Sequence, residues 1–381
     1  MTRGFSTYLN LLRFAAAMIV LLSHFAYARY SGGGFLWVRE LNLGSDAVIL
    51  FFVLSGYVIA YTAERKDHAL GRFLFNRATR IYTVALPALV LGFACDRLGA
   101  ALAPEVYDDW WYNALPLWEL LLRGLSFSNE WYLWPQRLGS NGPYWSLSYE
   151  VIYYALFAAA FYLRGAARAG LIALGAGLAG LNILLLMPAW LCGVALYRRV
   201  SRGARPPRGA ALGYALLPAL AYVLALAMGI PEILKGLTYL RLPFFAHAGL
   251  RFSDEFLWNG LIGLLVTVHL FGMSGLLTGG ALARFEAPVA WAAGGSFSIY
   301  LMHYPLLSLF SVLLPETGLR ALDHLLLFGL TLLACLAFAQ AFERPLGRWR
   351  ARIRALGRRF TSARASAQGA GQAERSSAPA R

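Results

Sequence analysis

The stretch LNLLRFAAAMIVLLSHF, residues 9–25, decides the fold class, because it is long and apolar enough for a membrane helix and yet carries an arginine and a histidine. A charged side chain at the bilayer centre costs about 2.5 to 3.5 kcal/mol on insertion scales, so its presence indicates function. Arg13 and His24 lie eleven positions apart, which on an α-helix is a rotation of roughly 20° after three turns and a rise of about 16 Å. We therefore expect both side chains on one helix face, at opposite depths.

The composition of the whole chain agrees with a membrane protein. Of its 381 residues, 59% are hydrophobic and 14% are charged, whereas soluble proteins are about 45–50% apolar. The net charge of +15 lies mostly in short loops and near the C-terminus, which favours membrane orientation over binding of nucleic acid. Cys95, Cys192 and Cys335 fall in apolar segments without metal-ligand spacing, so we expect them to pack in the interior and expect no metal site.

The apolar runs predict an all-α integral membrane protein with about ten transmembrane helices. The run 188–199 is too short to cross without tilt, and only Met187-Pro188 divides it from its neighbour. The ten runs are 9–27, 46–63, 81–97, 144–163, 169–187, 188–199, 210–228, 256–277, 289–313 and 321–342.

Lysine and arginine predict the orientation of these helices. With the N-terminus in the cytoplasm, 24 of the 34 basic residues lie on the inner side, 9 lie outside, and Arg13 lies within the membrane. Because cytoplasmic loops carry an excess of Lys and Arg, this count predicts that both termini are inside. We expect a membrane domain over residues 1–349 and a basic, disordered cytoplasmic tail over 350–381, which has few large apolar residues.

Two long segments then lie on the outer side. Residues 98–143 carry five tryptophans, which are typical of an aromatic belt with interfacial helices. Aromatic platforms also suit sugar rings, so a lid over an acceptor site is the alternative. Residues 229–255 have a mixed character that fits a re-entrant or interfacial segment. The tryptophans of the first segment are Trp110, Trp111, Trp118, Trp131 and Trp134.

Six motifs resemble, in order, those of the acyltransferase family 3 membrane proteins, in the form without a fused periplasmic domain. The stretch 9–25 is similar to the family's first helix, in which ten residues separate an Arg from a His. Because the six motifs follow one another from residue 9 to about 349, the resemblance covers nearly the whole chain. The other five are LGSDAVILFFVLSGYVIA, RFLFNRATRIY, YWSLSYEVIYYALF, GSFSIYLMHYPLL and FERPLGRW.

Three positions depart from the family pattern. Asn10 stands where an Asp often follows the leucine of the first motif, and Thr83 stands where a proline commonly follows Arg-Ile-Tyr. Ile49 replaces an acidic residue before the Phe-Phe pair, although Asp46, nearly one turn earlier, can reach the same helix face. These departures blur the substrate subgroup.

The resemblance implies transfer of an acyl group, usually acetyl from cytoplasmic acetyl-CoA, to a hydroxyl of a cell-surface glycan or another carbohydrate-like acceptor, as in polysaccharide O-acetylation. It implies acyl-CoA, the acceptor and the lipid bilayer as partners, and a multi-pass protein of the bacterial inner (plasma) membrane. A secondary transporter is the alternative, which the lack of an internal repeat and of a matching pair of broken helices disfavours. The exact acyl group and the oligomeric state stay open.

Helix depth indicates a catalytic pair. With the N-terminus inside, His24 lies near the outer end of the first helix, and Glu150 lies at a similar depth in the fourth, which runs inward. Acyl transfer to an alcohol needs a base, for which histidine has a suitable pKa, and a carboxylate can orient that base. We expect His24 to act as general base, Glu150 to orient it, and Arg13 to assist from the inner half. Covalent acylation of His24 is the alternative.

Arg77 and Arg80, three residues apart, lie near the cytoplasmic end of the third helix and suit the phosphates of CoA. A topological anchor is the alternative reading of this pair. An extended pantetheine arm would then run past Arg13 toward His24. The candidate substrate-binding residues are Asp46, Trp145, Ser146, Tyr300 and His303. Belt and helix-cap roles are the alternatives for Trp145 and Ser146, and a helix–helix hydrogen bond is the alternative for His303.

Overall fold

The computed structural model describes residues 2–132, 135–241, 250–278, 280 and 282–356, and in these ranges it is helical without a β-strand. The helices in chain order are α1 (Arg3–Phe25), α2 (Ala28–Ser31), α3 (Leu36–Glu40), α4 (Leu43–Arg65), α5 (Leu70–Leu102), α6 (Pro104–Tyr107), α7 (Leu117–Ser126), η1 (Gly142–Tyr144), α8 (Trp145–Tyr162), α9 (Gly165–Ser201), α10 (Arg208–Ala227), α11 (Ile230–Arg241), η3 (Arg251–Ser253), α12 (Phe256–Leu276), η4 (Ala283–Phe285), α13 (Glu286–Ala293), α14 (Ser296–Leu313) and α15 (Arg320–Phe338). A π-helical turn, Ala339–Glu343, follows α15, and a last helix covers residues 346–356.

In the described part of the chain, eight helical stretches are long and apolar enough to cross a membrane. They are α1, α4, α5, α9, α10, α12, α14 and the continuous stretch from α15 to Leu356. This confirms an all-α protein with several membrane-competent helices. The run 144–163 forms α8. This helix is not apolar enough to count among the eight, because its first turns carry Ser146, Ser148 and Glu150.

The expected division between residues 187 and 188 is wrong. Pro188 lies inside α9, and the helix is interrupted instead at Gly180, which has φ 74° and ψ 174°. Only glycine adopts this backbone conformation without strain. A proline is tolerated within an apolar helix of a membrane protein because neighbouring groups satisfy the freed carbonyl. The run 289–313 is also divided, at Gly294-Gly295, into α13 and α14.

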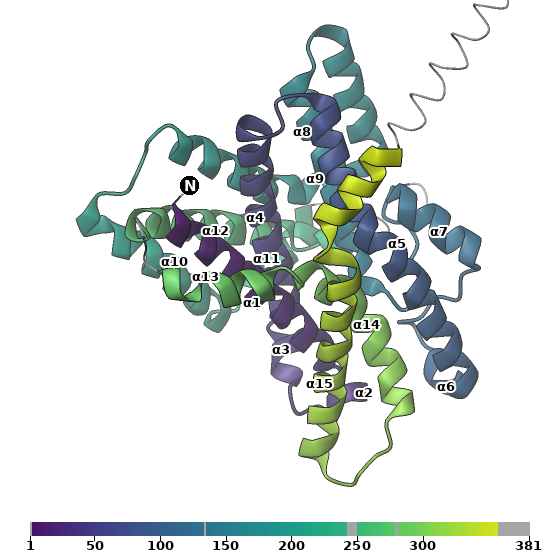
Figure 1. Cartoon of the computed structure of the whole chain (residues 1–381). Coiled ribbons are helices and arrows are strands. Elements are labelled where there is room, and N and C mark those ends of the chain that lie inside the picture. Colours follow the sequence, from purple (N-terminus) through teal and green to yellow (C-terminus); the bar gives the residue numbers. More distant parts are fainter. Residues whose placement is uncertain (1, 133–134, 242–249, 279, 281, 357–381) are drawn as a thin grey trace, which may run out of the picture.

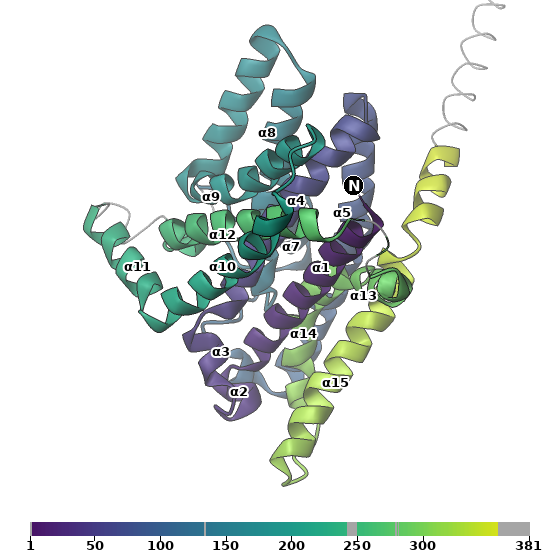
Figure 2. The same cartoon turned by 90° about the vertical axis from the view of Figure 1, so that its left-hand side faces the viewer.

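Figure 1 shows α4, α5, α14 and α15 together in the middle of the molecule, with α10 and α12 on one flank and α6 and α7 on the other. The view of Figure 2 brings α10 and α12 to the front and shows α1 running diagonally beside α14. Helices α4 and α9 approach closely at two glycines: a Cβ on Gly56 would overlap the carbonyl oxygen of Trp190, and one on Gly193 would overlap that of Val53. This contact positions α4, which lines the two cavities described below.

The C-terminal segment begins as a helix. Residues 350–356 continue the helix from 346, and Arg350 donates hydrogen bonds to Thr79 Oγ1 at 2.9 Å and to the carbonyl of Asn76 at 2.7 Å, both on α5. The start of the expected disordered tail is therefore helical and held against α5. Residues 357–381 lie outside the described residues.

The segment 98–143 contains the end of α5 and the short helices α6 and α7. Trp110 and Trp118 are 65% and 68% exposed, as an aromatic belt requires, whereas Trp111 is buried. Trp134 lies outside the described residues. The segment 229–255, the second that the sequence predicts to lie outside, contains α11 and η3, and its residues 242–249 also lie outside the described ranges.

Candidate functional site

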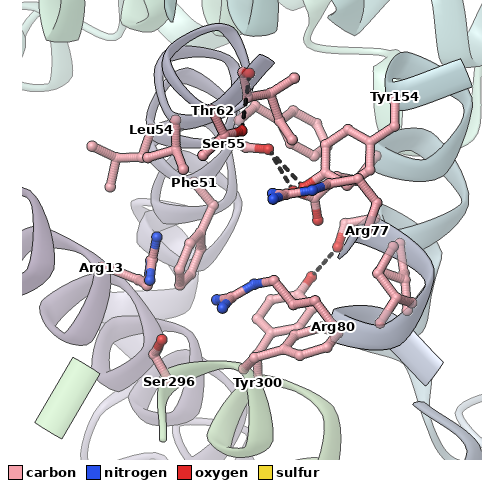
Figure 3. A pocket seen from close by; sticks show the side chains of 18 of the residues that line it. Arg13, Phe51, Leu54, Ser55, Thr62, Arg77, Arg80, Tyr154, Ser296 and Tyr300 are labelled. Carbon is pink, nitrogen blue, oxygen red and sulfur yellow. Dashed lines mark hydrogen bonds between the residues drawn. The ribbon is translucent and has the colours of Figure 1, made fainter. Parts of the chain in front are cut away.

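A cavity of about 350 Å³, here called the arginine cavity, lies between α1, α4, α5, α8, α14 and the helix 346–356. Figure 3 shows the guanidinium groups of Arg13, Arg77 and Arg80 entering this space. Arg350 also lines it, and Glu150 is the one acidic residue among the described lining residues. Four arginines against one carboxylate make the cavity suited to a ligand with several negative charges.

The position of the arginine pair on α5 follows from its spacing. Arg77 and Arg80 are three residues apart within one helix, so their side chains leave the same face, as the sequence predicts. Asp67, just before α5, lies 3.5 Å from Arg77 Nη2 and also accepts a hydrogen bond from Asn76 Nδ2 at 2.6 Å. This carboxylate pairs with Arg77, while Figure 3 shows Arg80 directed into the cavity.

A second, wider hollow of about 680 Å³ adjoins the arginine cavity, with which it shares Thr62, Arg77 and Arg350. It adds three further basic side chains, Lys66, Arg72 and Arg354. The sequence motifs did not indicate Arg350 or Arg354 as site residues. The available signal was the alternation of arginines in RWRARIR, whose members at 350 and 354 lie one helical turn apart.

The predicted contact between Glu150 and His24 is wrong. The Glu150 carboxylate accepts hydrogen bonds from the hydroxyl groups of Ser55 and Tyr154 and lines the arginine cavity. Glu150 and Tyr154 lie one turn apart on α8, on the face that meets α4. The sequence predicts similar depths in the membrane for Glu150 and His24. However, the helix face that carries Glu150 points into the arginine cavity, whereas His24 lines another cavity.

His24 lines a separate cavity of about 230 Å³, here called the histidine cavity. Trp145 forms part of its wall and stacks on Phe252, with ring centroids 4.4 Å apart and planes at 8°. Arg39 lines the same wall, where it donates a hydrogen bond to Ser23 Oγ at 3.3 Å. The cavity therefore offers a flat aromatic surface and polar groups beside one imidazole. Its other charged lining residues are Lys235, Arg251, Asp254 and Glu255.

The hydrogen bonds of two histidines determine the tautomer of each. His24 Nδ1 lies 2.8 Å from the carbonyl of Val20, and His303 Nδ1 lies 2.8 Å from that of Ile299. Because a carbonyl can only accept, each Nδ1 carries a hydrogen. His303 Nε2 is then a free acceptor, 3.1 Å from His24 Nδ1. The Nδ1–H of His24 is shared between Val20 and His303, which leaves its Nε2 as the unprotonated nitrogen.

Aromatic rings hold this imidazole pair in place. The ring centroids of His24 and Tyr304 are 4.9 Å apart at 80°, and Tyr27 lies 6.1 Å from His24. Arg29 donates a hydrogen bond to the Tyr304 hydroxyl and lies 4.1 Å from the ring centroid of Trp111. His24 is thus fixed in a packed aromatic environment rather than free at a membrane surface.

Val48 and Tyr300 line both the arginine cavity and the histidine cavity. The Tyr300 hydroxyl lies 2.7 Å from Ser146 Oγ and donates to the carbonyl of Pro143 at 2.9 Å. The predicted residues Arg13 and His24 thus belong to two spaces that meet at these side chains. Of the other predicted residues, Trp145 lines the histidine cavity, and Ser146 lines the arginine cavity and contacts Tyr300. His303 is in neither lining but contacts His24.

Comparison with known proteins agrees with the family resemblance that the motifs carry. A family model described as an acyltransferase domain matches residues 6–343, which is nearly the whole chain. The chain belongs to acyltransferase family 3. No solved structure matches it.

Two curated relatives of this chain match over shorter stretches. It is 31% identical over 151 residues to acyltransferase MdmB of Streptomyces mycarofaciens, across 38% of this chain and 36% of that protein. It is 37% identical over 81 residues to an O-acetyl transferase of Shigella phage Sf6, across 21% of this chain and 24% of that protein. The matches thus cover about a third and a quarter of these relatives.

The structure does not support Asp46 as a substrate-binding residue. Its carboxylate is 6% exposed and accepts hydrogen bonds from Tyr222 at 2.7 Å and from Trp258 Nε1 at 3.0 Å. Tyr222 lies on α10 and Trp258 on α12. Asp46 therefore ties three helices together and does not line either cavity described above. Asp46 was predicted to bind substrate because it lies close to the Phe-Phe motif in the sequence, which does not show toward which helices its side chain points.

Proposed function

We propose that this family 3 acyltransferase moves an acyl group, acetyl in the simplest case, from cytoplasmic acyl-CoA to a hydroxyl of a cell-surface glycan. The observation that carries the proposal is a series of three adjoining spaces. The first is the wide hollow lined by Lys66, Arg72 and Arg354, here called the basic mouth; the others are the arginine cavity and the histidine cavity. The printed name of the phage relative, O-acetyl transferase, supports a hydroxyl acceptor. The two ends of this path suit two different substrates.

The donor end suits CoA. Its phosphates carry several negative charges, and arginine binds phosphate through charge-assisted, often bidentate hydrogen bonds. Arg72, Arg77, Arg350 and Arg354 surround the wide mouth, and Arg80 and Arg13 lie further along. We infer that the nucleotide lies at the mouth and that the pantetheine arm extends through the arginine cavity. The excess of basic residues at this end supports a cytoplasmic position for it.

The acceptor end suits a sugar. The stacked pair Trp145 and Phe252 provides an apolar wall, and Arg39, Asp254 and Glu255 provide hydrogen-bonding groups around it. Sugar rings combine apolar faces with a rim of hydroxyl groups, so such a cavity matches their two kinds of surface. We infer that the acceptor enters from the outer side of the bacterial inner membrane.

The chemistry follows from the histidine tautomers. His24 Nε2 takes the proton of the acceptor hydroxyl as that oxygen attacks the thioester carbonyl. The C–O bond forms, the C–S bond breaks, and the imidazolium returns the proton to the leaving sulfur, which yields an ester and CoA thiol. His303 Nε2 accepts the Nδ1–H of His24 throughout, so it orients the base in the way a carboxylate does in hydrolase triads. His303 takes the role expected of Glu150.

Inverted membrane vesicles from a producing cell provide the test. Acetyl-CoA labelled in the acetyl group is added to the exposed cytoplasmic side, and label is measured in the surface-glycan fraction before and after mild alkali, which cleaves esters. We expect alkali-labile label with the wild-type protein and a loss of about 10² to 10⁴ in rate with His24→Ala. Unchanged transfer by a folded His24→Ala protein would contradict the role of this base. Solute movement without consumption of thioester would indicate a transporter.

A further inference from the structure

The arginine cavity and the histidine cavity share two of their described lining residues, Val48 on α4 and Tyr300 on α14. Both are buried, with 5% and 7% exposure. The arginines that suit the donor line the first cavity and His24 lines the second. Under the proposed function, the thioester carbonyl and the acceptor hydroxyl must therefore meet beside these two side chains.

Tyr300 is held in one position at this junction. Its hydroxyl donates to the carbonyl of Pro143, which lines the histidine cavity, so the Ser146 hydroxyl must be the donor of the 2.7 Å bond to Tyr300. Ser146 lines the arginine cavity. Phe51 packs with its ring at 72° to that of Tyr300, at a centroid distance of 5.8 Å. Figure 3 shows Tyr300 beside Ser296 and Arg80, at one end of the arginine cavity.

We propose that Val48 and Tyr300 form a constriction between the donor and acceptor spaces and that this constriction limits the transferred group to a short acyl chain. The inference rests on the proposed function and adds the class of donor. A packed interior does not expand to admit extra methylene groups without strain, so a fixed tyrosine and a buried valine set an upper limit on chain length. The acyl chain lies against Val48 while its carbonyl faces the acceptor.

Chain-length preference tests the specificity. Acetyl-, butanoyl- and hexanoyl-CoA, each labelled in the acyl group, are compared as donors in the vesicle assay. One methylene in a fitted pocket changes selection by about 10- to 200-fold, so we expect wild type to prefer acetyl over butanoyl at least tenfold. Val48→Ala should reduce that ratio at least tenfold. Val58→Ala, which removes the same atoms from the arginine cavity alone, should leave the ratio unchanged.

Cysteine labelling tests the constriction without any acyl transfer. The three native cysteines are replaced by alanine, and one reporter is added: Ser45→Cys in the histidine cavity or Ser296→Cys in the arginine cavity. An anionic, membrane-impermeant methanethiosulfonate is applied to the outer side. We expect it to modify Ser45→Cys readily and Ser296→Cys at least tenfold more slowly. Tyr300→Ala should remove most of that difference, and Tyr300→Phe, which keeps the ring, should preserve most of it.

Each result has one reading. Equal changes of the chain-length ratio in Val48→Ala and Val58→Ala, or equal use of acetyl and butanoyl by wild type, overturn the specificity. Rapid outside labelling of Ser296→Cys in the wild-type background overturns the constriction. If no CoA thioester supports transfer, the proposed function fails, while the labelling difference between Tyr300→Ala and Tyr300→Phe still decides whether Tyr300 separates the two spaces.

Discussion

The contacts of His24 Nδ1 determine which nitrogen of this imidazole can act as a base. A lone histidine near a membrane surface has two equivalent possibilities for its proton, whereas here Val20 and His303 together hold the hydrogen on Nδ1. The free nitrogen is thereby selected before any substrate binds. His303, buried at 0% exposure and bonded to its own helix at Ile299, has little freedom to turn away. Under the proposed function, this arrangement makes His303 a positioning residue.

Substitution of His303 separates positioning from packing. Gln places an acceptor oxygen near the former Nε2, so His303→Gln should retain most of the wild-type kcat, whereas His303→Leu should lower it about 10- to 100-fold, in line with a lost orienting hydrogen bond. Initial rates of acetyl transfer at saturating donor measure this. A merely structural role would lower the amount of folded protein in both variants and leave kcat per folded molecule alike, which fluorescence-detected size exclusion would reveal.

The paired arginines on α5 should contribute to donor binding rather than to chemistry. Hydrogen bonds to charged groups contribute about 1.5 to 3 kcal/mol each, so we expect Arg77→Gln with Arg80→Gln to weaken CoA binding roughly 100-fold. Calorimetric titration of CoA into the protein in nanodiscs measures this affinity without an acceptor. Arg198→Gln with Arg202→Gln removes the same charge from the exposed end of α9, away from the cavities. Equal affinities in the two double variants would make Arg77 and Arg80 topological anchors.

At the scale of helices, close approach of α4 and α9 positions the cavity wall. Gly56 and Gly193 allow the two backbones to meet, because a side chain at either position would overlap a carbonyl of the other helix. In lipid, the hydrophobic effect does not drive apolar helices together. Small residues at such contacts allow the close packing that holds the helices in contact instead. Val48 and Ser55, which line the arginine cavity, lie on the same α4.

Filling that contact should destabilise the protein. We expect Gly193→Ala to lower the free energy of unfolding by about 1 to 3 kcal/mol, as overpacking of an interior does. The midpoint of thermal unfolding in detergent measures the effect. Gly329→Ala is the matched control, because a Cβ there meets no atom within 4 Å and alanine favours a helix by about 1 kcal/mol. A loss of similar size in both variants would contradict a special contact between α4 and α9.

For the molecule as a whole, the direction of transfer depends on orientation in the membrane. The basic mouth, with Lys66, Arg72 and Arg354, should face the cytoplasm because of the excess of positive charge on that side. The exposed aromatic residues Trp110 and Trp118 would then lie at the outer interface. Donor and acceptor would approach from opposite faces and meet at Tyr300.

Labelling from one face tests this orientation. In a background without native cysteines, Trp118→Cys should react with an impermeant maleimide added to intact cells, whereas Arg202→Cys should react only after the membrane is opened. Both positions are exposed and lie outside the cavities, so neither is expected to affect donor binding. The reverse pattern would place the arginine cavity outside and exclude cytoplasmic CoA as the donor.

The sequence by itself determined the class of protein, most of its apolar helices and the main candidate site residues. Hydropathy indicates how deep a residue lies in the membrane, and the order of the motifs indicates the family. Together they pointed to Arg13, His24, Arg77 and Arg80, which line the two cavities. Tertiary structure decided the partners. Glu150 contacts Ser55 and Tyr154 instead of His24.

The reason is geometrical. In a helix that is apolar on nearly every side, the sequence carries little information about its rotation around its own axis, and depth alone cannot tell which polar residues of different helices face one another. Asp46 was therefore expected near substrate but ties α4 to α10 and α12. The contact between His303 and His24 is visible only once α14 lies beside α1. The break lies at Gly180 rather than before Pro188 for a local reason: glycine adopts φ 74° and ψ 174° without strain, whereas neighbouring groups can satisfy the carbonyl that a proline frees.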